Sequence, residues 1–309
     1  MAQKVFIDGE AGTTGLQIAE RLDKRDDITL IRLDDAERKD PAARKAALLE
    51  ADIAILCLPD AASIEAYEMV QGSDTRLLDA STAHRVADGW VYGFAEMTEG
   101  QSDAIANARF VANPGCYPTG AIGLMRPLRE AQLLPASTPI SVNAVSGYTG
   151  GGKAMIAEYE AGQAPGGFVY ATAQVHKHLP EMTAYGLLES QPIFVPSVGN
   201  FAQGMIVQIP LHLGTIAGVP SLDDLHGALS HHYAGSEFVK VLPTDDSQAR
   251  IDAEVLNNTN MLHLEVRGNA DKGQAVLIAV LDNLGKGASG AAVQNLNLMM
   301  GVDQTTGLV

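Results

Sequence analysis

Residues 4–15 read KVFIDGEAGTTG, and this stretch decides the fold of the first part of the chain. Lys4–Asp8 reads as a short strand, and an apolar helical pattern begins directly after the stretch. Between them, Gly9, Gly12 and Gly15 permit a tight turn and a close backbone approach to a ligand. A helix that opens on such a turn points N–H groups and the positive end of its dipole at a phosphate. We therefore predict a nucleotide site here; the GxxGxxG spacing leaves a plain strand-to-helix turn as the alternative.

Outward from that stretch, strands and helices alternate. Strand-like runs at 29–33 and 76–80 flank a helical, charged run at 40–50 and an almost wholly apolar run at 52–58. A run of the latter kind is typical of a strand buried on both faces. Alternation of this kind predicts a parallel, doubly wound α/β sheet.

From about Ser137 the pattern changes, and strand-like runs lie close together. This change predicts a second, mostly antiparallel α+β domain, after which residues 290–300 have helical spacing. The strand-like runs are Pro139–Val145, Gly204–Leu213, Asn260–Arg267 and Gln274–Leu281.

The composition excludes several classes of function. The 309 residues carry 21 Lys and Arg against 37 Asp and Glu, a formal charge of −16. Such a surface repels nucleic acid and anionic membranes, so we expect neither as a partner. No apolar run approaches the roughly 20 residues of a membrane span, and no signal peptide precedes the first strand. We therefore expect a cytoplasmic protein with a small-molecule substrate.

The stretch Asn113–Gly120, NPGCYPTG, carries the strongest sign of chemistry. A strand-like run precedes it, an apolar helical pattern follows, and Pro118 suits a first helical turn. Cys116 is then at a helix N-terminus, where the dipole stabilises a thiolate and lowers the thiol pKa. We predict that Cys116 is a nucleophile. Cys57, inside an apolar strand, is predicted to be a packed small hydrophobe, and two cysteines exclude a disulfide framework.

Residues 176–181, HKHLPE, gather two imidazoles, a lysine and a carboxylate. In an extended chain His176 and His178 share one face, whereas Pro180 and Glu181 suit the first turn of a helix. These groups suit general acid–base chemistry and anion binding. The alternatives are a polar loop or a zinc pair, but the sequence offers no further cluster of zinc ligands, and we predict no metal.

Ser146–Lys153, SGYTGGGK, contains a GxxxxGK match from Gly147 onward. The next residue is Ala154, so the hydroxyl that would bind Mg²⁺ is missing, and the segment lies in mid-chain. We therefore predict a flexible, cationic loop that holds a small anion rather than an ATP site.

Asp282–Gly290, DNLGKGASG, precedes the last predicted helix. Its glycines suit a backbone that passes close to a ligand, and Asn283 offers a donor and an acceptor, as a carboxamide partner would need. On the residues alone, an ordinary strand-to-helix loop is an equal interpretation. For His231–His232 and Asn257–Asn260 we predict solvated loops.

The end of the second predicted strand carries both signs of charge. Asp34 and Asp35 can take a ribose hydroxyl, which favours NAD, whereas Arg38 and Lys39 can take a 2′-phosphate, which favours NADP. The residues leave this choice open. The residues that we predict to contact the cofactor are Gly9, Gly12, Thr13, Thr14, Gly15, Arg38, Ser81 and Asn283.

Taken in order, NPGCYPTG at 113–120, the HxHxPE pattern at 176–181 and the ending DNLGKGASGAAVQNLNLMMG at 282–301 resemble the N-acetyl-γ-glutamyl-phosphate reductase family, in its shorter bacterial type. The resemblance covers essentially the whole chain, and the plan it implies is similar to that of aspartate-semialdehyde dehydrogenase. It implies a Rossmann-like, parallel-sheet NADP domain formed by residues 1–115 and 284–309. It also implies a mostly antiparallel, dehydrogenase-type catalytic domain, residues 116–283, that assembles as a homodimer or homotetramer.

The resemblance also implies roles for individual residues. The family's nucleophile corresponds to Cys116, and its histidine pair to His176 and His178. Lysine stands at 153 and 177 where the family usually has arginine, which keeps the charge but loses the bidentate fork. The substrate-binding residues are then Ser146, Gly147, Lys153, Lys177 and Glu181.

The implied reaction is the NADPH-dependent reduction of N-acetyl-γ-glutamyl phosphate to N-acetylglutamate semialdehyde in arginine biosynthesis, through a thioester on Cys116. We favour His178 for proton transfer and His176 for substrate binding. Three alternatives remain: a related reductase of aspartyl or N-acetyl-aminoadipyl phosphate, a non-catalytic NADP-sensing protein on the same fold, and a P-loop kinase.

Overall fold

The structure, a computed structural model, describes residues 2–244 and 250–308 and divides into two compact units. Unit 1 comprises Met1–Ala95, Gly100–Pro114 and Ala288–Val309, and unit 2 comprises Glu96–Glu99 and Gly115–Gly287. Each unit contains one sheet, of six strands in unit 1 and seven in unit 2.

The sheet of unit 1 is parallel throughout, as the alternating pattern predicted. Its strand order is β2-β1-β3-β4-β6-β5. The chain places β2 on one side of β1 and β3 on the other, so the order of strand addition reverses between β1 and β3. Ligands bind at this position in open α/β sheets. The second strand ends two residues earlier than predicted. The strands are β1 (Gln3–Asp8), β2 (Ile28–Ile31), β3 (Ile53–Leu56), β4 (Arg76–Asp79), β5 (Val91–Tyr92) and β6 (Phe110–Ala112).

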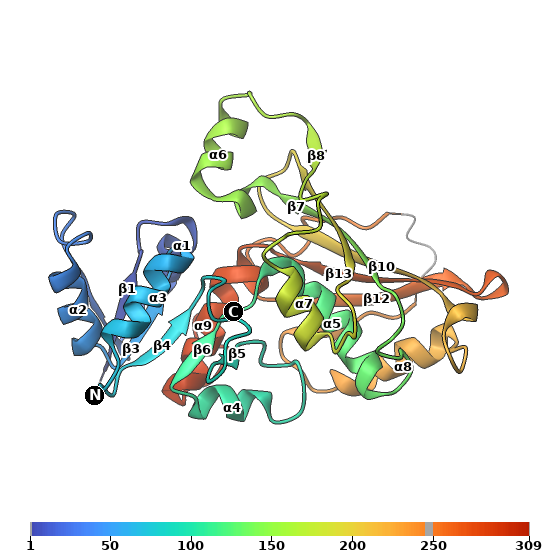
Figure 1. The fold of residues 1–309 in the computed structure, drawn as a ribbon, viewed down its shortest axis with the longest axis horizontal. Coiled ribbons are helices and arrows are strands. Elements are labelled where there is room, and N and C mark those ends of the chain that lie inside the picture. Colours follow the sequence, from blue (N-terminus) through green and yellow to red (C-terminus); the bar gives the residue numbers. More distant parts are fainter. Residues whose placement is uncertain (1, 245–249, 309) are drawn as a thin grey trace. The chain divides into compact units, whose positions relative to one another are not determined.

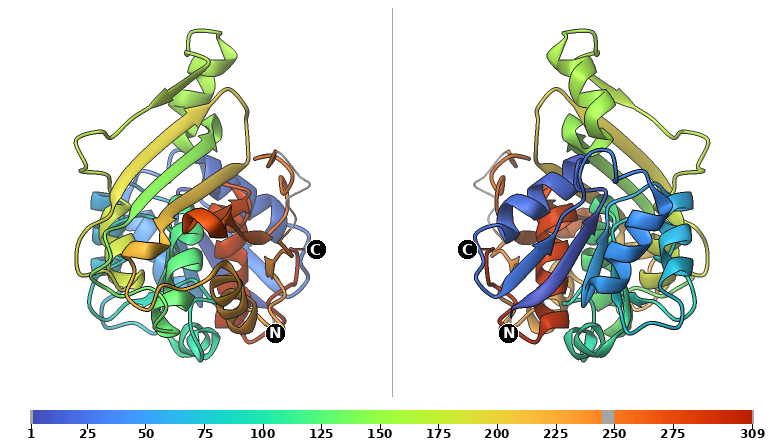
Figure 2. Two further views of the ribbon diagram at one scale, coloured as in Figure 1. Left: turned by 90° about the vertical axis from the view of Figure 1, so that its right-hand side faces the viewer. Right: turned by 90° about the vertical axis from the view of Figure 1, so that its left-hand side faces the viewer.

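Helices cover both faces of this sheet, because β3 is fully buried and needs apolar partners on each side. Helix α1 (Thr13–Leu22) packs against α9 (Gly290–Met300), and α2 (Pro41–Glu50) packs against α3 (Asp60–Met69). The right-hand view of Figure 2 shows these two pairs on opposite sides of the blue strands. The short helix α4 (Gln101–Asn107) also packs on α9.

Gly9 shows why the turn after β1 needs glycine. Its φ of +89° lies in the left-handed region, and an added Cβ would lie 2.3 Å from the carbonyl oxygen of Cys57. An added Cβ at Gly15 would lie 2.6 Å from the carbonyl oxygen of Gly9. The chain can therefore turn from β1 into α1 only with glycine at these positions, and the predicted strand, turn and helix are confirmed.

The sheet of unit 2 is mixed with antiparallel pairing dominant, as predicted. Four of its six neighbouring pairs are antiparallel, and only β11–β12 and β7–β9 are parallel. The strand order is β11-β12-β13-β10-β7-β9-β8. The strands are β7 (Ser141–Gly147), β8 (Gly167–Val169), β9 (Ile193–Gly199), β10 (Met205–His212), β11 (Val239–Val241), β12 (Leu262–Asn269) and β13 (Gln274–Leu281).

Helix α5 (Cys116–Glu130) is the central helix of unit 2. It packs on β10 and β13 and contacts both α7 (Leu179–Tyr185) and α8 (Leu222–His232), as Figure 1 shows. Helix α6 (Gly152–Glu160) lies between β7 and β8 in the chain and has no buried residue. Within 2–244 and 250–308, no helix has the length and apolar character to cross a bilayer.

Candidate active site

Cys116 is the first residue of α5, so the predicted helix start is observed. Gly115 before it is extended, with φ −74° and ψ 152°, and no side chain caps the helix. The Gly115 N–H donates to Oε2 of Glu181 at 3.1 Å, and Glu181 is 1% exposed. This contact fixes the turn that carries the thiol to the first turn of α7.

Tyr117 links the helix start to both histidines. Its ring centroid lies 6.2 Å from that of His176 and 5.9 Å from that of His178. Its hydroxyl donates to the carbonyl of Ser197 at 3.1 Å and accepts from the hydroxyl of Tyr170 at 3.4 Å. The contacts of Tyr117 and Tyr170 were not predictable from the sequence, because a tyrosine has no spacing signature of its own.

Both phenols stay protonated near neutral pH. Burial is the main cause that raises the pKa of Tyr170 to about 12 and that of Tyr117 far above its usual value. In both cases the negative charge of a Cys116 thiolate adds to the shift. The Cys116 thiol is therefore close enough to both phenol hydroxyls to affect their pKa. The rings of His176 and His178 pack against Tyr117 in the same region.

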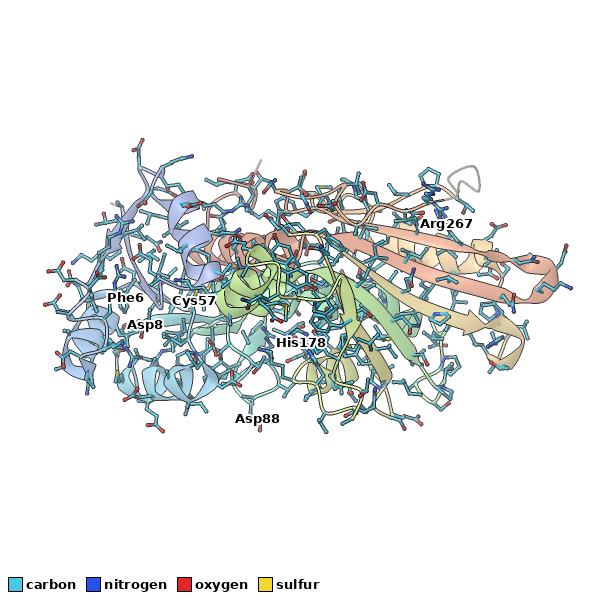
Figure 3. All side chains as sticks on the ribbon, turned by 90° about the horizontal axis from the view of Figure 1, so that it is seen from above. Phe6, Asp8, Cys57, Asp88, His178 and Arg267 are labelled. Atoms are coloured by element: carbon cyan, nitrogen blue, oxygen red, sulfur yellow. The ribbon has the colours of Figure 1, made fainter. Side chains whose placement is uncertain are left out.

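The extended chain that we predicted for the histidines is wrong. His178 has φ −87° and ψ −9° and caps α7, because the helix begins at the next residue. The two rings nevertheless meet, with centroids 4.6 Å apart and planes at 67°. His178, labelled in Figure 3, is buried, whereas His176 is half-buried and Lys177 is exposed. Pro180 and Glu181 lie in the first turn of α7, as predicted.

The flexible loop predicted at 146–153 is also wrong. β7 ends at Gly147, a 3₁₀ turn covers Tyr148–Gly151, and α6 begins at Gly152. Buried Ser146 donates to the Gly147 carbonyl, whereas Lys153 is exposed on α6. The segment therefore has regular secondary structure, and its charge lies at the start of a helix.

The side chain of Asn283 makes a hydrogen bond to this segment. Its Oδ1 accepts from the Gly204 N–H at 2.8 Å, and its Nδ2 donates to the Thr149 hydroxyl at 3.0 Å. Both contacts lie within unit 2. A role of Asn283 toward a cofactor stays a prediction.

The glycine at 287 allows the backbone to pass against Cys116. A π-helical turn covers Gly285–Ser289, and an added Cβ at Gly287 would lie 2.8 Å from Cβ of Cys116. π-turns are rare and occur mostly at functional sites. Cys116, the predicted nucleophile, thus packs directly against a glycine backbone.

Two buried groups hold that turn. The Asp282 carboxylate accepts from the N–H groups of Leu284 at 2.9 Å and Asn258 at 2.7 Å. Lys286, 2% exposed, places Nζ 2.7 and 2.8 Å from the two carboxylate oxygens of Glu96. Burial lowers the pKa of Lys286, although Glu96 acts in the opposite direction.

These contacts correct two predictions of solvated loops. The Asn258 N–H donates to buried Asp282, and Asn260 is 2% exposed, so the turn at 257–260 is anchored and partly buried, although Asn258 itself is exposed. His231 and His232 are the last residues of α8 and not a loop. His232 bonds through Nε2 to the Glu96 carbonyl at 3.1 Å and is partly buried, whereas His231 is exposed. Sequence reasoning missed both because their partners lie far away in the chain.

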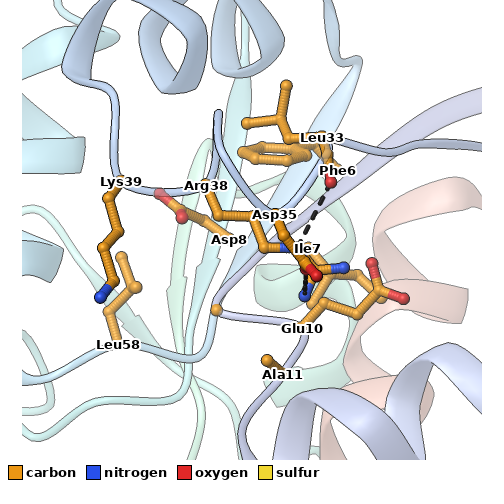
Figure 4. Close-up of a pocket in the computed structure, with 11 residues that line it drawn as sticks. Phe6, Ile7, Asp8, Glu10, Ala11, Leu33, Asp35, Arg38, Lys39 and Leu58 are labelled. Carbon is orange, nitrogen blue, oxygen red and sulfur yellow. Dashed lines mark hydrogen bonds and ion pairs between the residues drawn. The ribbon is translucent and has the colours of Figure 1, made fainter.

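Unit 1 contains a pocket of about 370 Å³ at the carboxyl ends of β1 and β2. In Figure 4, Arg38 lies between Leu33 and Asp35, donating to the Leu33 carbonyl at 3.3 Å and pairing with Asp35 at 3.0 Å. The lining residues are Phe6, Ile7, Asp8, Gly9, Glu10, Ala11, Leu33, Asp35, Arg38, Lys39 and Leu58.

The helix next to this pocket suits a phosphate. α1 begins at Thr13, and Gly12 at its N-cap provides no side-chain hydrogen bond, so the first N–H groups and the dipole are left to a ligand. The predicted residues Gly9, Gly12, Thr13, Thr14 and Gly15 form this turn and helix start. The pocket, its two cations and the helix start together fit a dinucleotide.

Ser81 belongs neither to the glycine turn nor to the start of α1; it follows the end of β4. Its hydroxyl donates to Oδ2 of Asp79 at 2.7 Å, and it is 7% exposed. Ser63 and His84 bond to the same carboxylate at 3.1 and 2.6 Å. The Ser81 hydroxyl thus belongs to a buried network, and its contact with a cofactor stays a prediction.

The two thiols differ in their surroundings, and neither forms a disulfide. Burial raises the pKa of Cys57 to about 12, with Asp79 and Asp8 adding to the shift. Figure 3 labels Cys57 close to Asp8, whose backbone carbonyl accepts from the Cys57 N–H at 2.8 Å. Among the described residues, no group of three His, Cys, Asp or Glu is arranged to hold a metal ion.

Comparison with known proteins identifies the relatives of the chain. A family model described as semialdehyde dehydrogenase, dimerisation domain, matches residues 116–283. The N-acetyl-gamma-glutamyl-phosphate reductases of Brucella suis and Brucella canis are each 56% identical over 309 residues, covering 97% of this chain and 100% of theirs.

Solved structures share the fold. Aspartate semialdehyde dehydrogenase from Francisella tularensis has a TM-score of 0.71 at 13% identity, covering 97% of this chain and 100% of that chain. The enzyme with NADP from Candida albicans has a TM-score of 0.66 at 13% identity, covering 97% and 99%. The predicted pairing of a Rossmann-like domain with a dehydrogenase-type domain is confirmed.

Proposed function

The chain belongs to the N-acetyl-γ-glutamyl-phosphate reductase family, and from this premise we propose that it reduces N-acetyl-γ-glutamyl phosphate to N-acetylglutamate 5-semialdehyde and phosphate, in arginine biosynthesis. The observation that carries the proposal is Cys116 at the uncapped N-terminus of α5, where the next residue, Tyr117, packs against the rings of His176 and His178. A helix start favours a thiolate, and an acyl phosphate is a substrate that a thiolate can attack.

The residues of unit 2 act in a fixed order. The Cys116 thiolate attacks the acyl carbon, phosphate leaves, and a thioester remains on the enzyme. Bound NADPH supplies a hydride to the thioester carbonyl. The resulting thiohemiacetal on Cys116 collapses to the semialdehyde and releases the thiolate, and the histidine pair manages the proton. Exposed Lys153 and Lys177 are candidates for holding the anionic groups of the substrate.

The direct test is the reverse reaction: reduction of NADP⁺ with N-acetylglutamate semialdehyde and phosphate. We expect turnover that depends on phosphate and exceeds turnover with aspartate semialdehyde or N-acetyl-aminoadipate semialdehyde. A higher kcat/KM with either alternative would reassign the substrate, and NADP binding without any turnover would indicate a nucleotide-sensing protein.

We propose NADPH as the cofactor because Arg38 and Lys39 line the pocket of unit 1 beside an uncapped helix start. Arg38→Ala is expected to raise the KM for NADPH about fivefold, since a half-exposed ion pair with a phosphate contributes up to about 1 kcal/mol. The KM for NADH should change less than about twofold. Initial rates with both cofactors measure the difference.

Lys45→Ala is the matched control, because Lys45 is an exposed cation on α2 outside the pocket lining. Equal effects of the two substitutions would show that net charge, and not a 2′-phosphate contact, governs cofactor binding.

We further propose a homodimer or homotetramer working in the cytoplasm, where a reactive thiol stays reduced. The matched family model, a dimerisation domain, supports the assembly.

A further inference from the structure

Asp8, the last residue of β1, places a carboxylate in the wall of the pocket of unit 1. This pocket is the proposed site of the 2′-phosphate of NADPH, and a negative charge in its wall repels that group. The side chain of Asp8 is only 5% exposed, so solvent ions screen its charge weakly. The pocket therefore needs a cation beside Asp8 if it is to bind an anion.

Arg44 of α2 supplies this cation without lining the pocket itself. Its Nε lies 3.3 and 3.1 Å from the two carboxylate oxygens of Asp8, and its Nη2 lies 2.9 Å from Oδ2. Its Nη1 donates to Oε2 of Glu65, an exposed residue of α3, at 3.2 Å. The side chain of Arg44 is 9% exposed. Arg44 therefore acts on the pocket through Asp8.

The charges of the two residues depend on each other. Burial is the main cause that raises the pKa of Asp8, and the hydrogen bond and charge of Arg44 oppose this shift. Burial also acts to lower the pKa of Arg44, but the carboxylates of Asp8 and Glu65 hold it above its usual value. Together Asp8 and Arg44 form a neutral pair. Without the guanidinium, the carboxylate at the pocket wall is left uncompensated.

The other carboxylates that line the pocket are paired as well. Oε1 of Glu10 lies 3.5 Å from Nε of Arg32, and Oδ1 of Asp35 lies 3.0 Å from Nη1 of Arg38. Lys39 also lines the pocket, and in the part of the chain that the structure describes it forms no hydrogen bond or ion pair (Figure 4). Each lining acid is thus offset by an arginine, and Lys39 leaves an excess of positive charge. In a chain with a net charge of −16, this local excess favours a phosphate.

We propose that Arg44 determines cofactor specificity: by neutralising Asp8 it lets the pocket hold the 2′-phosphate of NADPH, although it does not touch the cofactor. This inference rests on the proposed use of NADPH. Arg38 and Lys39 contact the phosphate, and Arg44 sets the electrostatic potential in which they act. NADH has no 2′-phosphate, so the charge of Asp8 affects its binding much less.

Arg44→Met removes the guanidinium and leaves Asp8 without its cation. We expect the Kd for NADPH to rise about tenfold and the Kd for NADH to change by less than about twofold. The titrations are made at about pH 8.5, which favours the ionised form of a carboxyl whose pKa is raised by burial. Nicotinamide fluorescence measures both constants without any acyl substrate.

Three further variants test whether the effect passes through Asp8. Arg44→Met combined with Asp8→Asn removes both charges and should return the Kd for NADPH to within about threefold of the wild-type value. Arg44→Lys keeps the charge but loses the fork, and should also stay within about threefold. Asp8→Asn alone should lower the Kd for NADPH about threefold relative to that for NADH, and it tests the proposal even if Arg44→Met does not fold.

Arg25→Met is the matched control. The side chain of Arg25 is 5% exposed, and it forms a two-pronged pair with Asp27 at 2.9 and 2.7 Å, also in unit 1. Arg25 does not line the pocket, so both Kd values should change by less than about twofold. Thermal unfolding of every variant identifies a folding defect.

Several results would overturn the proposal. They are an equal weakening of NADPH and NADH in Arg44→Met, no recovery of NADPH binding in the double variant, and a weaker binding of NADPH in Asp8→Asn. A wild type that binds NADPH no more tightly than NADH would refute the proposed cofactor together with this inference. The expected Kd pattern in a protein without turnover would refute the proposed reaction alone.

Discussion

Replacing Cys116 with alanine should abolish turnover, with a fall in kcat of at least about 10⁴-fold, since loss of a covalent nucleophile costs about 10⁴ to 10⁶ in known enzymes. The physical reason is that a thioester accepts a hydride more readily than an oxygen ester does. Without the Cys116 sulfur no thioester forms. Binding of NADPH should be retained, because Arg38 and Lys39, the residues proposed to hold its 2′-phosphate, are unchanged in this variant. Steady-state rates and a fluorescence titration of NADPH measure both effects.

Cys57→Ala is the control for this experiment. The Cys57 thiol has its pKa raised to about 12 by burial, so it is protonated near neutral pH and a poor nucleophile. We expect near-normal kcat in Cys57→Ala, and alkylation by iodoacetamide at Cys116 only. Normal turnover in Cys116→Ala, or inactivation of Cys57→Ala with an intact fold, would contradict the assignment of the nucleophile.

Replacing Lys286 with methionine should destabilise unit 2 by about 3 to 5 kcal/mol, as expected when one partner of a buried ion pair is removed. The pair is deeply buried, with side chains 2% and 11% exposed, and the Lys286 ammonium also lies 5.3 Å from the Phe238 ring centroid. The remaining Glu96 carboxylate would lose its cationic partner in an apolar setting. Urea unfolding monitored by circular dichroism measures the change in free energy.

Two variants make this prediction specific. Lys4→Met breaks an exposed pair with Glu50 and should cost less than about 1 kcal/mol. Lys286→Met combined with Glu96→Met removes both charges and should recover most of the lost stability. Equal stability of wild type and Lys286→Met would show that the pair does not stabilise the fold. A double variant as unstable as the single one would assign the effect to packing instead.

Patterns with a local cause were predictable. The turn at Gly9, the helix start at Cys116 and the buried strand β3 depend on backbone angles, dipoles and apolar runs that adjacent residues determine. The family resemblance then supplied the substrate class, which no single motif identifies. The histidine pair was found by its residue types, although its predicted extended backbone was wrong.

Contacts over long chain distances were not predictable. Lys286 meets Glu96 across 190 positions, and Asn283 meets Thr149 across 134. Neither pair has a spacing rule, because a buried charge or carboxamide takes whichever partner the fold brings near. For the same reason the loops at 257–260 and His232 were mistaken for solvated segments.

The sequence by itself determined the two kinds of sheet, the glycine turn after β1 and the helix start at Cys116, because each depends on periodicity or on a few neighbouring residues. Only the tertiary structure decided what surrounds Cys116: the carboxylate of Glu181, the phenols of Tyr117 and Tyr170, and the glycine backbone at 287. It also decided the contact between the His178 amide and Nδ1 of His176. Protonation states depend on the atoms that pack against a group, and packing is a property of the folded chain.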